Sequence, residues 1–270
     1  MSFGLQRINL RYKISDLLSV KVGRLHTPLG YWNEVFHHGS WLQTTVGRPE
    51  IYRFEREDGG FLPVHSVGLE LSGEGEIASV DLGYNAYVLN GRGRTVTEVQ
   101  HVKDKNDSKG FGVLFKAKPH AIEGLQFGPL VYWDRIPGDP PTAGRTDHID
   151  ELILGAHTIY LREPVELLGE LFHIHHDDKT SEKNFDTLGF YLQGGYRLGK
   201  TKPYYRFDYV DVANADPYFT GVRRVDRTKH TLGLRWDVLN WNALKFEYAF
   251  TDRQTSDQEH AFTVNSSFTF

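Results

Sequence analysis

The sequence predicts an all-β protein whose fold class is a transmembrane, antiparallel, up-and-down β-barrel. Three observations predict it. Aromatic residues make up 13% of the chain, and 27 of its 270 residues are glycine, a composition typical of β-rich proteins. Apolar and polar residues alternate with a period of two almost from end to end, which gives each strand one apolar face. Short and long connections also follow one another in turn, as they do in barrels that cross a membrane.

The composition excludes several other classes of protein. No stretch approaches the ~20 consecutive apolar residues of a membrane helix, and the mean hydropathy is −0.46. The chain has no cysteine, which excludes disulfides, zinc–thiolate sites and cysteine nucleophiles. Its net charge is −4, so nothing indicates a general nucleic-acid binder.

The first strand shows the rule that predicts the others. Ile8, Leu10 and Tyr12 alternate with polar residues, and this spacing scatters apolar residues around a helix but aligns them on one face of a strand. The stretch 165–174 is ambiguous, because the pair Leu167–Leu168 breaks strict alternation. About 13 strands result, centred on residues 8–14, 18–22, 67–71, 80–88, 111–117, 125–133, 152–160, 165–174, 188–196, 205–209, 232–238, 244–250 and 262–270.

The connections between these strands keep a strict parity. The long ones are 28–63, 90–109, 136–147, 176–184, 213–229 and 252–259. The remaining connections are short and alternate with the long ones, so all the long loops lie on one side of the sheet. A soluble sandwich has no reason to keep this alternation. The longest loop is expected to contain a short helical turn near residues 32–37, and no other helix is predicted.

The chain is expected to form a single barrel domain over residues 1–270. Counting back from the last strand, the first visible strand would start on the external side, and barrels of this kind have an even number of strands. We therefore expect that an N-terminal signal and the first strands are missing from this chain.

The two faces of the predicted strands differ in the way that a wet lumen and a lipid surface require. One face is apolar, with aromatic residues near strand ends, as in the aromatic girdles of membrane barrels. The other carries full charges in mid-strand, which a small packed barrel could not bury. A soluble β-sandwich with its charged face in solvent stays open as an alternative.

Several motifs resemble bacterial outer-membrane porins, most closely the phosphate-selective porin O/P type family. Leu18 to Gly30, with the sequence LSVKVGRLHTPLG, is similar to that family's second-strand segment, with Leu25 and Leu29 in place of phenylalanine. The stretches 59–63 and 189–197 and the terminal Phe270 also resemble related porins. The resemblance implies a 16-stranded barrel in the full-length protein, usually trimeric, in the outer membrane of a Gram-negative bacterium.

Charged residues of the polar face are candidates for the lining of a pore. Ten basic and seven acidic residues are assigned to this face, so the face is mildly basic although the whole chain is acidic. Rings of like charge set the selectivity of a pore. The alternative is that Arg206 and Asp208, or Arg235 and Asp237, simply pair across neighbouring strands. The basic pore-lining candidates are Arg7, Arg11, Lys13, Lys21, Lys116, Lys118, Arg197, Arg206, Arg235 and Lys245.

The loop 28–63 is the candidate constriction, because a long loop folds inward in porins. Aromatic residues beside arginines could stack sugars or aromatic solutes, and the alternative is an external loop packed on its neighbours. The candidates are Trp32, His37, His38, Trp41, Arg48, Arg53 and Arg56.

One histidine-rich motif resembles a metal site. His173, His175, His176 and Asp177 include histidines at i and i+2 of a strand, which can bind zinc or copper. A solvated polar loop explains the same residues, so they are kept only as candidates and no metal is predicted.

The predicted function is passive diffusion of small hydrophilic solutes, with a possible preference for anions. No catalytic motif is present, so we expect neither an enzyme nor a cofactor. The expected partners are outer-membrane lipid and lipopolysaccharide, small solutes or anions, and two further copies in a homotrimer. A structural or adhesin-like barrel that binds partners through its loops, and a barrel enzyme, stay open as alternatives.

Overall fold

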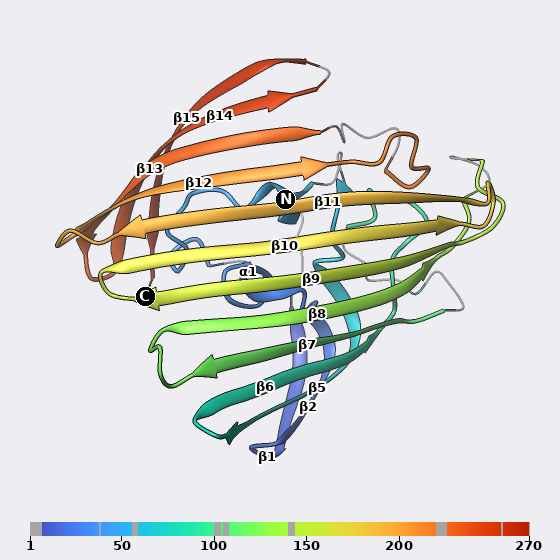
Figure 1. Cartoon of the computed structure of the whole chain (residues 1–270), viewed down its shortest axis with the longest axis horizontal. Coiled ribbons are helices and arrows are strands. Elements are labelled where there is room, and N and C mark those ends of the chain that lie inside the picture. Colours follow the sequence, from blue (N-terminus) through green and yellow to red (C-terminus); the bar gives the residue numbers. More distant parts are fainter. Residues whose placement is uncertain are drawn as a thin grey trace.

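The computed structural model describes residues 7–37, 39–55, 59–99, 104, 108–139, 144–219, 226–254 and 256–269. Thirteen strands form one sheet in which each strand pairs antiparallel with its neighbour in sequence (Figure 1). This confirms the predicted all-β, up-and-down architecture. The strands are β1 (Ile8–Ser15), β2 (Leu18–His26), β5 (His65–Ile77), β6 (Val80–Leu89), β7 (Gly110–Pro119), β8 (Leu125–Ile136), β9 (Ile149–Arg162), β10 (Val165–Asp178), β11 (Lys183–Tyr196), β12 (Thr201–Asp211), β13 (Arg227–Leu239), β14 (Asn242–Arg253) and β15 (Ser256–Phe268).

The sheet is curved but not closed. Among the described residues, β1 pairs only with β2 and β15 pairs only with β14, so two edges have no partner strand. No helix in the described part of the chain is long and apolar enough to cross a membrane.

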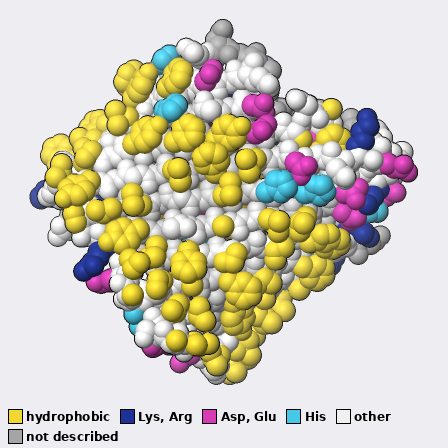
Figure 2. Space-filling view, in the orientation of Figure 1, with side chains coloured by type: hydrophobic (Ala, Val, Ile, Leu, Met, Phe, Trp, Pro, Cys, Tyr) yellow, Lys and Arg dark blue, Asp and Glu magenta, His cyan; other side chains and the backbone are white. Residues whose placement is uncertain are grey.

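The outward face of the sheet is apolar. Leu10 is 72% exposed, Leu192 58% and Phe262 84%, and such side chains recur at every second position of their strands. Figure 2 shows hydrophobic side chains spread over this face, with charged side chains gathered toward its ends. An exposed apolar surface of this extent marks a membrane or protein contact surface.

Two of the connections predicted to be long are short. β10 continues to Asp178 and β11 begins at Lys183, while β14 ends at Arg253 and β15 begins at Ser256. Both predictions were wrong because the hairpins extend beyond their apolar rows into polar sequence, where pairing continues although the residues lose their apolar alternation. The ambiguous stretch 165–174 is strand throughout.

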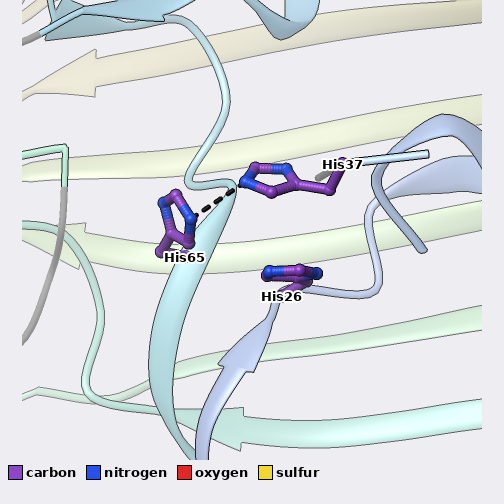
Figure 3. Close-up of side chains that lie close together, drawn as sticks. All are labelled: His26, His37 and His65. Atoms are coloured by element: carbon purple, nitrogen blue, oxygen red, sulfur yellow. Dashed lines mark hydrogen bonds between the residues drawn. The ribbon is translucent and has the colours of Figure 1, made fainter. Parts of the chain in front are cut away.

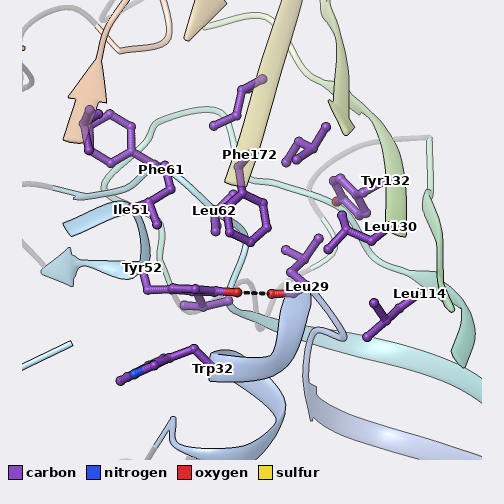
Figure 4. Close-up of a cluster of buried hydrophobic side chains, with 14 of the residues drawn as sticks. Leu29, Trp32, Ile51, Tyr52, Phe61, Leu62, Leu114, Leu130, Tyr132 and Phe172 are labelled. Atoms are coloured by element: carbon purple, nitrogen blue, oxygen red, sulfur yellow. Dashed lines mark hydrogen bonds between the residues drawn. The ribbon is translucent and has the colours of Figure 1, made fainter. Parts of the chain in front are cut away.

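The described residues between 27 and 64, which we call the inner segment, fold against the concave side of the sheet. They contain α1 (Gly30–Val35), the 3₁₀ helix η1 (Glu50–Tyr52), and the short strands β3 (Phe54–Glu55) and β4 (Gly59–Gly60). The helical turn predicted at 32–37 is present at 30–35. The hydrophobic core lies between this segment and the concave face of the sheet, which we call the wall. Trp32, Tyr52 and Phe172 are buried there (Figure 4).

Candidate functional site: the inner segment and the charged wall

Buried polar groups hold together the two ends of the inner segment, which we call its root. The side-chain amide of Asn33 donates to Thr27 O at 2.7 Å and to Val64 O at 3.0 Å. The hydroxyls of Thr27 and Ser66 lie 2.9 Å apart. These contacts join the point where the segment leaves β2 to the point where it enters β5.

Glu170 of β10 holds the start of α1. Its carboxylate accepts from Tyr31 N at 2.8 Å, from Trp32 N at 2.8 Å and from the Tyr191 hydroxyl at 2.7 Å. The Tyr52 hydroxyl lies between this carboxylate and Leu29 O, and Figure 4 shows the contact with Leu29. A strand residue of the wall therefore satisfies backbone N–H groups that the first turn of a helix leaves without partners.

Gly30 allows this approach. Its φ is +82°, and a Cβ there would lie 2.0 Å from Glu170 Oε2. Only glycine adopts such a conformation readily, and only glycine leaves room for the carboxylate.

Three basic side chains expected to line a water-filled pore are buried under the inner segment instead. Arg206 is 1% exposed, Arg235 7% and Lys245 0%. Arg206 donates to Gly47 O and Arg48 O, Arg235 donates to Trp41 O and Gln43 O, and Lys245 donates to the carbonyls of residues 40, 43 and 45. The prediction is corrected because strand alternation gives the face of a side chain and not what covers that face.

The two arginine–aspartate pairs also differ from their expected geometry. Arg206 pairs with Asp208 at 2.9 Å and Arg235 with Asp237 at 2.7 Å. Each pair lies along one strand, at i and i+2 on the same face, rather than across neighbouring strands.

The remaining pore-lining candidates lie nearer to solvent. Lys21 contacts Glu70 at 2.8 Å, Lys116 contacts Glu34 of α1 at 2.8 Å, and Arg197 contacts Asp237 at 2.7 Å. Arg11, Lys13 and Lys118 line a cavity of about 790 Å³, and Arg7 lines a smaller one of about 100 Å³.

Two cavities differ in charge. The cavity of about 790 Å³ is lined by five basic and six acidic side chains, so its charge is nearly balanced. A second cavity, of about 650 Å³, is lined by Arg48, Arg53 and Lys229 and by one acidic residue, Glu50. The second cavity lies against the inner segment and is basic.

The constriction candidates take different positions in the inner segment. Trp32 and His37 are buried. The Arg48 guanidinium lies 4.2 Å from the Phe54 ring centre, and that of Arg235 lies 5.0 Å from the Trp41 ring. Arg53 lies 3.9 Å from Glu50. His38 and Arg56 are outside the described residues.

The histidine motif that resembles a metal site is divided by its strand. His173 and His175 both contact Asp186, at 3.1 and 2.8 Å, and both are partly exposed. His176 points to the opposite face, fully buried between Glu151 and Asp216 at 2.9 and 2.8 Å. Asp177 pairs with Lys179. Since alternate residues of a strand face opposite sides, these four do not form one ligand set.

Sequence reasoning missed a second anchor of the inner segment. Arg92, just after β6, donates to Glu151 at 2.8 Å, to Gly60 O at 3.2 Å and to Phe61 O. The positive charge of the buried guanidinium is matched by the Glu151 carboxylate. Residue 92 falls in the long connection 90–109, and no local pattern in the sequence indicates that its side chain turns inward.

Solved structures of similar shape were found by comparison. An anion-selective porin from Comamonas acidovorans aligns with 96% of this chain and 71% of its own, with a TM-score of 0.66 at 12% identity. The in-vitro folded trimer form of OmpT, an outer-membrane protein of Vibrio cholerae, aligns with 97% of this chain and 80% of its own, with a TM-score of 0.59 at 13% identity. The chain has a porin-like fold. It matches no protein-family model and no curated protein sequence.

Within this porin-like fold, ionised groups hold the inner segment in place. Glu50 of η1 accepts from Arg227 at 3.1 Å and from Lys229 at 3.0 Å. Burial alone would raise the pKa of Glu50, but the charges of Lys229 and Arg227 outweigh it and lower the pKa to about 2. Burial raises the pKa of Glu34 and outweighs the opposing effect of Lys116.

The lowered pKa of Glu50 predicts a loss of stability in acid. A carboxylate whose folded pKa lies below its ordinary value of 4.5 stabilises the fold above that value and loses the contribution as pH falls toward 2. Urea unfolding at pH 6 and pH 2 should therefore show an acid loss on the order of 3 kcal/mol larger for the wild type than for Glu50→Gln. Glu74→Gln, at an exposed position of β5, should keep the wild-type acid loss. Identical acid losses in the wild type and Glu50→Gln would contradict the assignment.

Proposed function

We propose that the protein is an outer-membrane porin of a Gram-negative bacterium, which lets small hydrophilic solutes diffuse along the concave side of its sheet. One observation carries the proposal: the sheet is apolar on its outward face and charged on its concave face. The long inner segment is fixed against the concave face by Glu170, Arg206, Arg235 and Lys245. A segment held in this way reduces the cross-section without closing it, since cavities of about 790 and 650 Å³ remain beside it. The proposal needs no cofactor and no chemical step.

The basic cavity supports a preference for anions. Arg48, Arg53 and Lys229 face Glu50 there, and fixed positive charge at a narrow point raises the local concentration of anions. The similar Comamonas acidovorans protein is described as anion-selective. The sequence resemblance to phosphate-selective porins of the O/P type points in the same direction, toward small inorganic anions.

A channel in lipid requires that both sheet edges be paired, because an unpaired backbone group in the hydrocarbon region costs several kcal/mol. The proposal therefore includes closure of the barrel by strands additional to the thirteen, in a single barrel domain. It also includes a homotrimer, the form in which OmpT is described. Lipid and lipopolysaccharide would contact the apolar outward face.

The test is conductance of the natural full-length protein, extracted from the outer membrane of a producing cell and folded in detergent. Planar bilayers should show stepwise conductance, and a salt gradient should give a reversal potential of the sign for anion preference. A sample that shows a heat-modifiable gel shift, and is therefore folded, but gives no conductance steps would overturn the channel proposal. Cation preference would overturn only the part that concerns anions.

Reversing one charge in the basic cavity should change selectivity. Arg53→Glu should lower the anion-to-cation permeability ratio by about twofold or more, because rings of fixed charge set pore selectivity. Arg162→Glu is the matched control, since Arg162 lies at the end of β9, where it pairs with Glu123 at 3.2 Å, outside both cavities. Equal ratios for wild type and Arg53→Glu would show that this cavity is not on the ion path.

A further inference from the structure

Three histidines meet at the root of the inner segment. His26 ends β2 and His65 begins β5, and the two are direct partners in the antiparallel pairing of these strands. His37, which follows α1, packs on both of them (Figure 3), with ring centres 4.2 Å from His26 and 4.5 Å from His65. One ring nitrogen from each lies within 4.8 Å of the other two.

The orientation of His37 is fixed by its neighbours. The Asn33 amide donates to two backbone carbonyls, so its Oδ1 accepts from Nδ1–H of His37. The other nitrogen, Nε2, then carries a lone pair and accepts from Nε2–H of His65 at 2.9 Å. Second-sphere bonds of this kind, from one ring nitrogen to a fixed oxygen, orient histidines that bind metals through the other nitrogen.

We propose that His26, His37 and His65 form a binding site for one divalent transition-metal ion of the Zn²⁺ class. Metal–nitrogen bonds of about 2.0–2.1 Å in tetrahedral geometry place the nitrogens roughly 3.3 Å apart. The Nε2 atoms of His37 and His65 lie 2.9 Å apart, and one ring nitrogen from each of the three histidines lies within 4.8 Å of the other two, so small movements of the rings suffice. An ion between His37 and His65 replaces their hydrogen bond, and the proton on His65 Nε2 moves to the ring's other nitrogen or to water.

The surroundings favour this class of ion and leave it a path. Three imidazoles suit Zn²⁺, Cu²⁺ and Ni²⁺, whereas Mg²⁺ and Ca²⁺ prefer oxygen ligands. His37 lines the basic cavity of about 650 Å³, and His26 lines the cavity of about 100 Å³, so the ion and a water as fourth ligand can enter from either side.

Occupancy would join the inner segment to two wall strands through a single ion. This role does not depend on the passage of solutes. The site could fail its test while the channel proposal stands, and the reverse also holds.

The test is Zn²⁺ binding to the folded, metal-stripped full-length protein, measured by competition with a chromophoric chelator. One equivalent should bind tightly, and His26→Ala should weaken this binding by at least about 100-fold, in the range seen when metal ligands or their orienting partners are lost. His26 is the variant of choice because it is only partly buried, and a heat-modifiable gel shift confirms that the variant is folded. The His173→Ala/His175→Ala double variant should bind as tightly as the wild type.

Two further measurements use the wild type alone. Co²⁺ should give the intense visible bands of tetrahedral coordination. Zn²⁺ affinity should be weaker at pH 5 than at neutral pH, because the ligands must be neutral imidazoles. The proposal is overturned if the wild type binds Zn²⁺ no more tightly than His26→Ala, if the double variant loses the binding, or if affinity is unchanged at pH 5.

Discussion

Replacing Arg206 by methionine is expected to lower the free energy of unfolding by about 3–5 kcal/mol, the range found when one partner of a buried ion pair is removed. Arg206 is almost fully buried, contacts Asp208 at 2.9 Å, and donates to Thr45 Oγ1, Gly47 O and Arg48 O of the inner segment. Methionine fills a similar volume but leaves the Asp208 carboxylate without its cation. The measurement is urea unfolding of the folded protein in detergent, followed by tryptophan fluorescence.

Arg197→Met is the matched control for this variant. Arg197 bridges Glu163 and Asp237 just beyond the end of β11, where its side chain is 25% exposed, and Asp237 keeps a second partner in Arg235. Its loss should cost less than about 1 kcal/mol, as for other exposed pairs. If the two variants unfold at the same urea concentration, the contacts of Arg206 with Asp208 and the inner segment do not stabilise the fold.

Replacing Glu170 by alanine is expected to release α1 from the wall and to cost about 3 kcal/mol or more. Tyr31 N, Trp32 N and the Tyr191 hydroxyl all donate to this carboxylate, and each buried donor left without an acceptor costs about 1–3 kcal/mol. Limited proteolysis gives a second readout, because a released inner segment should be cleaved under conditions in which the wild type is intact.

Glu170→Gln is the intermediate variant for that experiment, because it removes only part of the contacts of Glu170. Glutamine offers one acceptor oxygen where glutamate offers two, so it can keep Trp32 N and Tyr191 while Tyr31 N loses its partner. Its cost should fall between zero and that of alanine. An alanine variant as stable and as protease-resistant as the wild type would refute the anchoring role of Glu170.

The strands and their faces could be predicted because they depend on local chemistry. The alternation of Ile8, Leu10 and Tyr12 with polar residues is present in the sequence, and the pleat of a strand converts it directly into an apolar and a polar face. The thirteen strands of the main sheet follow from this rule. The same rule failed at the tips of two hairpins, where pairing continues through polar residues.

The candidate site could be predicted only in part. That residues 28–63 form the longest connection and that Arg206 and Lys245 face inward is contained in the spacing. That these cations are buried by carbonyls of residues 40–48 is not. A backbone carbonyl is available at every position, so sequence alone does not indicate which ones a buried cation will bind.

The two histidine groups separate the contributions of sequence and tertiary structure. His173, His175 and His176 are neighbours in the sequence, yet the strand sends His176 to the opposite face, and this division is already determined by the period of two. His26, His37 and His65 are spread over forty residues and meet only because β2 pairs with β5 while α1 folds back over their junction. The sequence by itself determined the all-β architecture, the lengths of most connections and the face of each strand residue, since these follow from local periodicity. The burial of the wall charges, the anchors of the inner segment and the histidine cluster were decided by tertiary structure, because they depend on contacts between residues far apart along the chain.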